Sequence, residues 1–303
     1  MLGYKPLDLM QLVITSLNKT YANGVRALKN INLTINSGMF GLLGPNGAGK
    51  SSLMRTIATL QEPDSGSISL GAIDVLHHKD EVRKTLGYLP QEFGVYPRIS
   101  AEDLLDHLAV LKGISNRKDR KELVTALLHK TNLFNDRKKH LSGYSGGMKQ
   151  RFGIAQALLS NPKLIIVDEP TAGLDPAERN RFLNLLGELS DETIVILSTH
   201  IVDDVKELCT DMAIINKGEV LMQGNPLKSL NDLTGKIWSK RVDRELAAGY
   251  KDRLNVVSDK LVAGKPTLHV LSDTQPEEGF DIINPDLEDV YFSYIFGAQT
   301  VTV

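Results

Sequence analysis

The segment that most constrains this chain is a glycine-rich run, GPNGAGKS, at residues 44–51. It matches the pattern G-x-x-x-x-G-K-[ST] and lies between an expected strand at residues 39–43 and an expected helix at residues 52–60. Glycines let successive backbone N–H groups face one concavity, and the start of the helix adds positive charge. We therefore expect the phosphates of a nucleotide to contact Gly44, Pro45, Asn46, Gly47, Ala48, Gly49, Lys50, Ser51 and Ser52.

Two carboxylates follow a second apolar run. Residues 164–167 read LIIV, and Asp168 and Glu169 come directly after them. Taken alone, this pattern also marks the start of an ordinary helix. Because adjacent carboxylates at the end of a buried strand are costly without a cation, the pattern is more specific downstream of a phosphate-binding loop. There it predicts that Ser51 and Asp168 bind Mg²⁺ and that Glu169 polarises the attacking water. Lys50 is expected to reach the β- and γ-phosphates.

Composition narrows the class of protein. The 303 residues include 35 Lys+Arg and 37 Asp+Glu, so the net charge of −2 provides no overall attraction for nucleic acid. The single Cys209 excludes an intrachain disulfide and a multi-cysteine zinc site, and we expect it in the core of a protein from a reducing compartment. We see no signal peptide and no run of 18 apolar residues. We therefore expect no transmembrane segment in this chain.

The order of apolar runs predicts an α/β fold with a mixed β-sheet core. Short strands alternate with helices on both sides of residues 92–161, which read as a mostly helical insertion. We expect one domain at residues 1–229 and a small α+β accessory domain at residues 230–303. In the accessory domain, a hairpin is expected around residues 264–266 and an aromatic helix at residues 287–296.

A further segment resembles a known family signature. Residues 140–151 read HLSGYSGGMKQR, which is similar to the L-S-G-G-Q signature of the ATP-binding cassette (ABC) ATPases. Tyr and Met replace the first and last residues of that motif, whereas its phosphate-contacting part is kept as Ser145, Gly146 and Gly147. The physical basis is again a helix N-terminus that offers backbone N–H groups to an anion.

Other positions of the family pattern follow in order across residues 11–228. Gln91 resembles the Q-loop residue that senses Mg²⁺ and the membrane partner, and Asp175 ends a segment, AGLD, that resembles the D-loop. His200 resembles the switch histidine at the γ-phosphate, although a lone histidine is more often structural. Tyr21 resembles the aromatic residue that stacks on adenine, although tyrosines beside turns are common.

The resemblance implies an ATPase that works as a dimer. In the family, each nucleotide lies between the phosphate-binding loop of one chain and the signature of the other. It implies ATP and Mg²⁺ as cofactors, a second ATPase subunit forming a homodimer, and a transmembrane permease subunit as a separate chain. The chain would then lie at the cytoplasmic face of the cell membrane. The implied catalytic residues are Lys50, Gln91, Glu169 and His200.

Export is the expected direction of transport, because residues 284–292 resemble the ending of export-type subunits; an ordinary amphipathic helix is the other interpretation of that segment. Residues 92–98 are expected to face the membrane partner.

The alternative function is a soluble ABC ATPase that acts on nucleic acid or ribosomes. One cassette, no sustained heptads and no basic arm favour the transporter, and Glu169 and His200 argue against a regulator without turnover.

Overall fold

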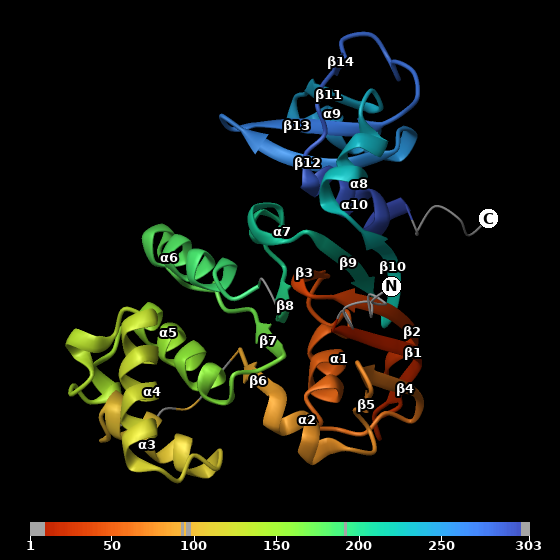
Figure 1. Cartoon of the computed structure of the whole chain (residues 1–303). Helices are drawn as coiled ribbons and strands as arrows, with labels where there is room; N and C mark the ends of the chain where they lie inside the picture. Colours follow the sequence, from red (N-terminus) through yellow and green to blue (C-terminus); the bar gives the residue numbers. More distant parts are fainter. Residues whose placement is uncertain (1–9, 92–93, 95–97, 191–192, 298–303) are drawn as a thin grey trace, which may run out of the picture.

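A computed structural model describes residues 10–91, 94, 98–190 and 193–297 (Figure 1). Its centre is a six-stranded sheet with the order β10-β9-β3-β8-β7-β6. The five strands from β9 to β6 run parallel, and β10 is an antiparallel edge strand. The mixed α/β sheet predicted from the sequence is therefore confirmed. In the order of the sheet, the strands are Glu219–Gly224, Asp211–Asn216, Gly38–Leu43, Ile194–Thr199, Leu164–Asp168 and Leu86–Leu89.

The central strands are apolar on both faces because helices and a second sheet cover them. Every residue of β7 and β8 is buried, as expected for parallel strands in the middle of an α/β sheet. The carboxyl ends of β3, β6, β7 and β8 meet at one edge of the sheet. The chain segments that follow these strands carry the glycine-rich loop, Gln91, Glu169 and His200, so the topology brings the predicted site residues to this edge.

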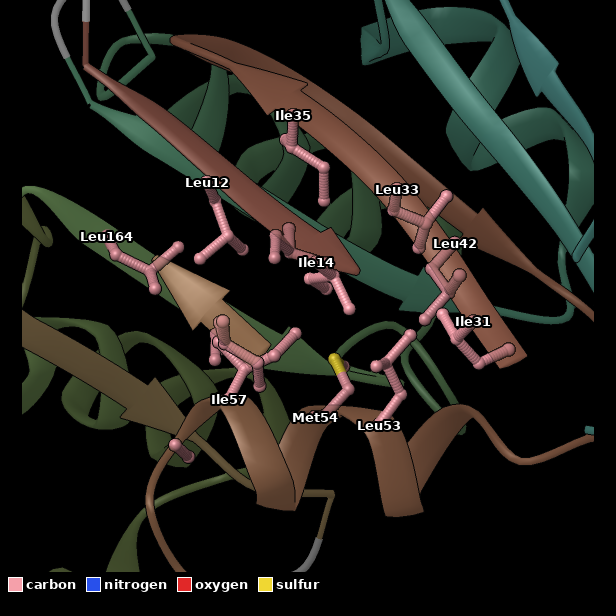
Figure 2. Close-up of a cluster of buried hydrophobic side chains, with 14 of the residues drawn as sticks. Leu12, Ile14, Ile31, Leu33, Ile35, Leu42, Leu53, Met54, Ile57 and Leu164 are labelled. Atoms are coloured by element: carbon pink, nitrogen blue, oxygen red, sulfur yellow. The ribbon is translucent and has the colours of Figure 1, made fainter. Parts of the chain in front are cut away.

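A second, antiparallel sheet covers one face of the central sheet, with helix α1 between the two. Its strand order is β2-β1-β4-β5. Figure 2 shows leucine and isoleucine side chains of β1 and β2 directed toward Leu53, Met54 and Ile57 of α1. These apolar residues at helical spacing make α1 the buried centre of this layer. The bounds are Gln11–Thr20 for β1, Arg26–Asn36 for β2, Ser65–Leu70 for β4, Ile73–Asp74 for β5, Lys50–Ile57 for α1 and Lys79–Thr85 for the peripheral α2.

Helices cover the opposite face of the central sheet. Here α6 (Pro176–Gly187), α7 (Val202–Leu208) and α10 (Leu287–Gly297) pack around the apolar residues of β3, β7 and β8. The buried Cys209 belongs to this cluster, which confirms its expected place in the core.

Residues 98–160 form a separate helical group (Figure 1). Helices α3 (Ala101–Leu111), α4 (Arg117–Lys130) and α5 (Gly146–Ala157) enclose their own apolar cluster, joined by short 3₁₀ turns at Phe134–Asp136, Leu141–Gly143 and Leu158–Ser160. Ser100, Asn116 and Ser145 each cap the start of one of these helices with a side-chain oxygen.

A third sheet, with the order β12-β13-β11-β14, lies at the end of the molecule opposite the helical group (Figure 1). Strands β12 and β13 form the hairpin predicted around residues 264–266. Helix α10 contacts β12 of this sheet and also α7 and β9 of the preceding part. The remaining bounds are Pro226–Leu233 for α8, Ile237–Arg241 for β11, Arg244–Arg253 for α9, Val256–Val262 for β12, Lys265–Leu271 for β13 and Asp281–Ile282 for β14.

No helix among the described residues combines the length and the apolar character needed to cross a membrane.

Candidate active site

A cleft of about 730 Å³ opens at the carboxyl end of β3. The glycine-rich loop and the start of α1 form its floor. Residues distant in the sequence complete its walls, because the sheet topology brings several loops to this edge. The predicted site residues that line the cleft are Tyr21, Pro45, Asn46, Gly47, Ala48, Gly49, Lys50, Ser51, Ser52, Gln91 and Glu169.

The loop keeps its shape because its glycines pack closely against other backbone segments. A Cβ atom on Gly44 would lie 2.3 Å from the carbonyl oxygen of Ile215 in β9. Gly49 has a φ of +111° and a Cβ there would lie 2.5 Å from the carbonyl oxygen of Ala27. Only glycine fits at both positions without displacing β9 or β2. Contacts with these two strands therefore fix the conformation of the loop.

Lys50 lies inside the curl of this loop. Its Nζ donates hydrogen bonds to the carbonyl oxygens of Gly44 at 2.6 Å and Pro45 at 3.3 Å, and it is 3.6 Å from a carboxylate oxygen of Glu169. Only 5% of the lysine is exposed. Burial lowers the pKa of Lys50, and the negative charges of Glu169 and Asp168 act in the opposite direction. A buried ammonium with N–H donors beside a row of loop amides suits a polyanion.

Three side chains converge on Glu169, which follows β7. His200 Nδ1 is 3.2 Å from one carboxylate oxygen, and Gln91 Nε2 is 3.5 Å from the same oxygen; Lys50 contacts the other oxygen. The backbone of Glu169 adopts a φ of +47°, a strained conformation for a residue with a Cβ. Its N–H donates to the carbonyl oxygen of Ser198, which holds the end of β7 against β8. The four residues predicted to be catalytic thus lie together.

Asp168 provides a test of whether a cation fits here. The residue is 4% exposed, and its Oδ1 atom is buried without a hydrogen-bond partner among the described residues. Such an orphaned carboxylate oxygen is rare in a folded protein and is the donor type that Mg²⁺ prefers. Because Ser51 lines the adjoining cleft, the residues present fit a nucleotide accompanied by a divalent cation.

Tyr21 lies at the edge of the cleft and is 37% exposed. Its hydroxyl is 2.9 Å from Ser52 Oγ and donates to Gln61 Oε1 at 3.1 Å. These bonds orient the ring beside the start of α1.

The exposed Lys217, in the turn between β9 and β10, also lines the cleft and was not singled out from the sequence. A lysine-glycine turn reads as an ordinary hairpin, so no sequence signal marked it.

The second set of predicted phosphate contacts lies outside this cleft. Ser145 caps α5 by accepting from the Met148 N–H at 3.2 Å, and Gly146 and Gly147 form the first residues of that helix. Asp175 caps α6 and accepts from the N–H groups of residues 177 and 178. None of these four described residues lines the cleft beside the glycine-rich loop. The chain therefore presents two separate sets of predicted nucleotide contacts.

Comparison with known proteins agrees with this geometry. Residues 28–172 match the family model described as ABC transporter. The protein YxlF of Bacillus subtilis, described as an uncharacterized ABC transporter ATP-binding protein, is 39% identical over 214 residues, which are 70% of each chain. The chain belongs to the ABC transporter family. It contains an ATPase domain of this family, and the family predicted from the sequence is confirmed.

Two further comparisons extend the likeness. YbhF of Escherichia coli K12, named a probable multidrug ABC transporter ATP-binding protein, is 32% identical over 290 residues, which are 90% of this chain and 50% of YbhF. The chain thus spans about half the length of that relative. A solved dimeric structure of the ATP-binding cassette MJ0796, in a post-hydrolysis state bound to ADP and Pi, superposes with a TM-score of 0.64 at 27% identity. It covers 71% of this chain and 98% of the cassette.

Proposed function

We propose that this chain is the ATP-hydrolysing subunit of a membrane transporter and that two copies form the working unit. The observation that carries the proposal is a cleft that is lined by a phosphate-binding loop, Lys50 and Glu169, with His200 in contact with Glu169. The proposed boundaries are an ATPase domain at residues 1–229, with a helical subdomain at about residues 92–161, and an accessory domain at residues 230–303.

The proposed chemistry follows from the position of each side chain. Lys50 and the loop amides bind the phosphates of ATP, and Tyr21 contacts the base. Ser51, Asp168 and Gln91 would hold Mg²⁺, which neutralises phosphate charge during phosphoryl transfer. Glu169 accepts the proton of the attacking water at the carboxylate oxygen that also contacts His200. His200 orients that carboxylate.

The dimer accounts for the second set of contacts. Ser145, Gly146 and Gly147 lie at the start of α5, outside the cleft of their own chain. We propose that this helix start and Asp175 complete the cleft of a second copy, so that each nucleotide lies between two chains. The dimeric MJ0796 cassette, to which this chain is similar over 71% of its length, supports the proposal.

A membrane partner is proposed for the groove between α1, β6 and the helical group. This groove has a volume of about 370 Å³, and its walls include the exposed Leu60 and Leu111 at 61% and 70% exposure. Exposed leucines around a groove are typical of a protein contact surface. The groove adjoins β6, which leads to Gln91. The predicted partner segment at residues 92–98 lies almost entirely outside the described residues and remains a prediction.

Export at the cytoplasmic face of the membrane is the proposed direction. The name of YbhF, probable multidrug ABC transporter ATP-binding protein, supports it, as does the resemblance of residues 284–292 to export-type subunits. Relatives named for import are also similar to this chain, as are relatives named for drug resistance. The direction therefore has to be measured with the partner present.

The decisive experiment replaces Glu169 with Gln. The amide keeps the shape of the carboxylate but accepts no proton, so ATP turnover falls about 10³-fold or more while ATP binding persists. Size-exclusion chromatography with ATP and Mg²⁺ then detects a stable dimer. Wild-type turnover by this variant would exclude Glu169 as the base.

The transporter itself is tested by purification from solubilised membranes. A tagged chain is expected to retain a polytopic membrane protein, and vesicles containing both proteins then report the direction of transport. Retention of ribosomes or nucleic acid, with no membrane protein, would instead support the soluble ATPase that the sequence left as an alternative.

A further inference from the structure

A fully buried carboxylate, Asp204, lies behind the candidate active site on α7, the first helix after His200. Its Oδ2 accepts hydrogen bonds from Thr171 Oγ1 at 2.6 Å and from Thr199 Oγ1 at 3.2 Å. Its Oδ1 accepts from Arg179 Nε at 2.7 Å. One carboxylate thus binds three side chains from three parts of the chain.

The charge of Asp204 is compensated where it lies. A carboxylate with no exposed surface is unfavourable unless an opposite charge and hydrogen bonds accompany it. Burial alone would lower the pKa of Arg179, but the hydrogen bond and charge of Asp204, with Glu207 adding to them, raise it. Arg179 therefore stays protonated and pairs with Asp204.

The partners of Asp204 are placed beside the two residues at the centre of the site. Thr199 directly precedes His200, and its Oγ1 also accepts from the Ile201 N–H at 2.9 Å. The turn that contains His200 is therefore fixed by hydrogen bonds at the residues before and after the histidine. Thr171 is two residues after Glu169, in the same loop. Asp204 is the shared acceptor that joins the loop of Glu169 to the turn of His200.

We propose that Asp204 is a positioning residue for ATP hydrolysis, because it keeps the His200 ring within contact distance of the Glu169 carboxylate. The proposal rests on the proposed function of the site. The His200 Nδ1 to Glu169 contact of 3.2 Å connects the loop after β7 with the turn after β8. A displacement of about 1 Å in such a pair lowers a rate by about 10²-fold, and Asp204 restricts that displacement without contacting the reacting atoms.

The first test is Asp204→Asn in the full chain. The amide keeps the volume but removes the charge and one acceptor, so kcat is expected to fall about 10- to 100-fold with little change in KM for ATP. The same substitution in a His200→Ala background is expected to cause little further loss, because Asp204 acts through His200. A merely structural role would make the two losses multiply.

Asp289→Asn is the matched control. Asp289 is an equally buried carboxylate at 0% exposure, but it lies in α10 and pairs with His269 Nδ1 at 2.7 Å. Removing its charge is expected to leave kcat at the wild-type value. Comparable losses for both variants would assign the effect of Asp204 to stability alone and overturn the proposal.

A second readout does not depend on hydrolysis. The chemical shift of the His200 ring in NMR spectra is expected to change in Asp204→Asn and to stay the same in Asp289→Asn. In Asp289→Asn, the chemical shift of the His269 ring is expected to change instead. If Asp204→Asn does not fold, Thr199→Val removes the Thr199 hydrogen bond to Asp204 together with the bond from the Ile201 N–H, and it is expected to move the same resonance.

The outcomes separate the two proposals. Absence of turnover in the wild-type dimer contradicts the proposed function, and the His200 resonance still decides the role of Asp204. Wild-type kcat for a folded Asp204→Asn, or an unchanged His200 resonance, overturns the positioning role.

Discussion

Two helices of this chain begin in glycine-rich segments expected to meet phosphate, and their surroundings differ. Helix α1 begins inside a cleft, with the buried Lys50 ammonium 3.6 Å from Glu169. Helix α5 begins outside that cleft, where Ser145 bonds back to its own helix. The start of α1 supplies the Lys50 ammonium and lies beside the Glu169 carboxylate after β7, two groups that the proposed hydrolysis uses. The start of α5 offers an anion its backbone N–H groups, and in the proposed dimer it serves the cleft of the other chain.

The glycines of the two segments are constrained by different neighbours. A Cβ on Gly44 would meet the backbone of β9, whereas a Cβ on Gly147 would lie 2.3 Å from the Glu178 carboxylate. Glu178 is held by Arg151 at 2.9 Å and Arg181 at 2.7 Å. The loop is therefore packed against β9, and the start of α5 is packed against α6. The two sets of contacts sit on separately packed units.

The largest effect that would test this comparison is expected for Lys50→Ala. The substitution removes the ammonium proposed to bind phosphate through charge-assisted hydrogen bonds, so ATP affinity is expected to fall about 100-fold or more. Equilibrium titration of the purified chain with ATP and Mg²⁺ measures it. Lys217→Asn, at the exposed turn beside the same cleft, is the control and changes affinity by less than about fivefold. Equal losses in both variants would contradict a special role for the buried lysine.

A mixing experiment directly tests the role of the start of α5. Ser145→Arg is expected to keep ATP binding by the separate chain but to abolish turnover, because the bulky cation would obstruct the helix start that we propose to face a second copy. Mixing this variant with Lys50→Ala creates dimers in which one of the two clefts has an intact loop and an intact signature. Turnover of the mixture above the sum of the two variants supports shared sites. No gain on mixing, with mixed dimers present, would contradict shared sites, and wild-type turnover by Ser145→Arg alone would mean that each chain hydrolyses ATP alone.

The smallest effect is expected at the edge of the first cleft. Tyr21→Ala removes the ring proposed to contact the base, and ATP affinity falls about threefold to tenfold. Tyr21→Phe keeps the ring and removes the hydroxyl bonds to Ser52 and Gln61; it is expected to bind ATP within about twofold of the wild type, since an exposed neutral hydrogen bond contributes little. An equal loss in both variants would assign the effect to the hydroxyl instead.

Much of the fold followed from local patterns. The apolar runs at residues 39–43 and 164–167 correspond closely to β3 and β7, and the aromatic run at residues 287–296 corresponds to α10. The pattern missed α2 and α7, each of seven residues, because two turns are too short for helical periodicity to stand out. Asp204 was missed with α7. In the run VDDVKEL it reads as a surface acid, and only the packing of Arg179 and the two threonines makes it a buried one.

By itself, the sequence determined the glycine-rich loop and the two carboxylates after an apolar strand, since these features depend on residues adjacent in the chain. Tertiary structure decided what the loop faces. The neighbouring positions of β3, β8, β7 and β6 bring Gln91, Glu169 and His200 to one edge, and that order depends on how the sheet forms. It also decided that Ser145 lies outside the cleft and that Asp204 joins two loops. Contacts between distant segments arise from packing, which local propensity does not encode.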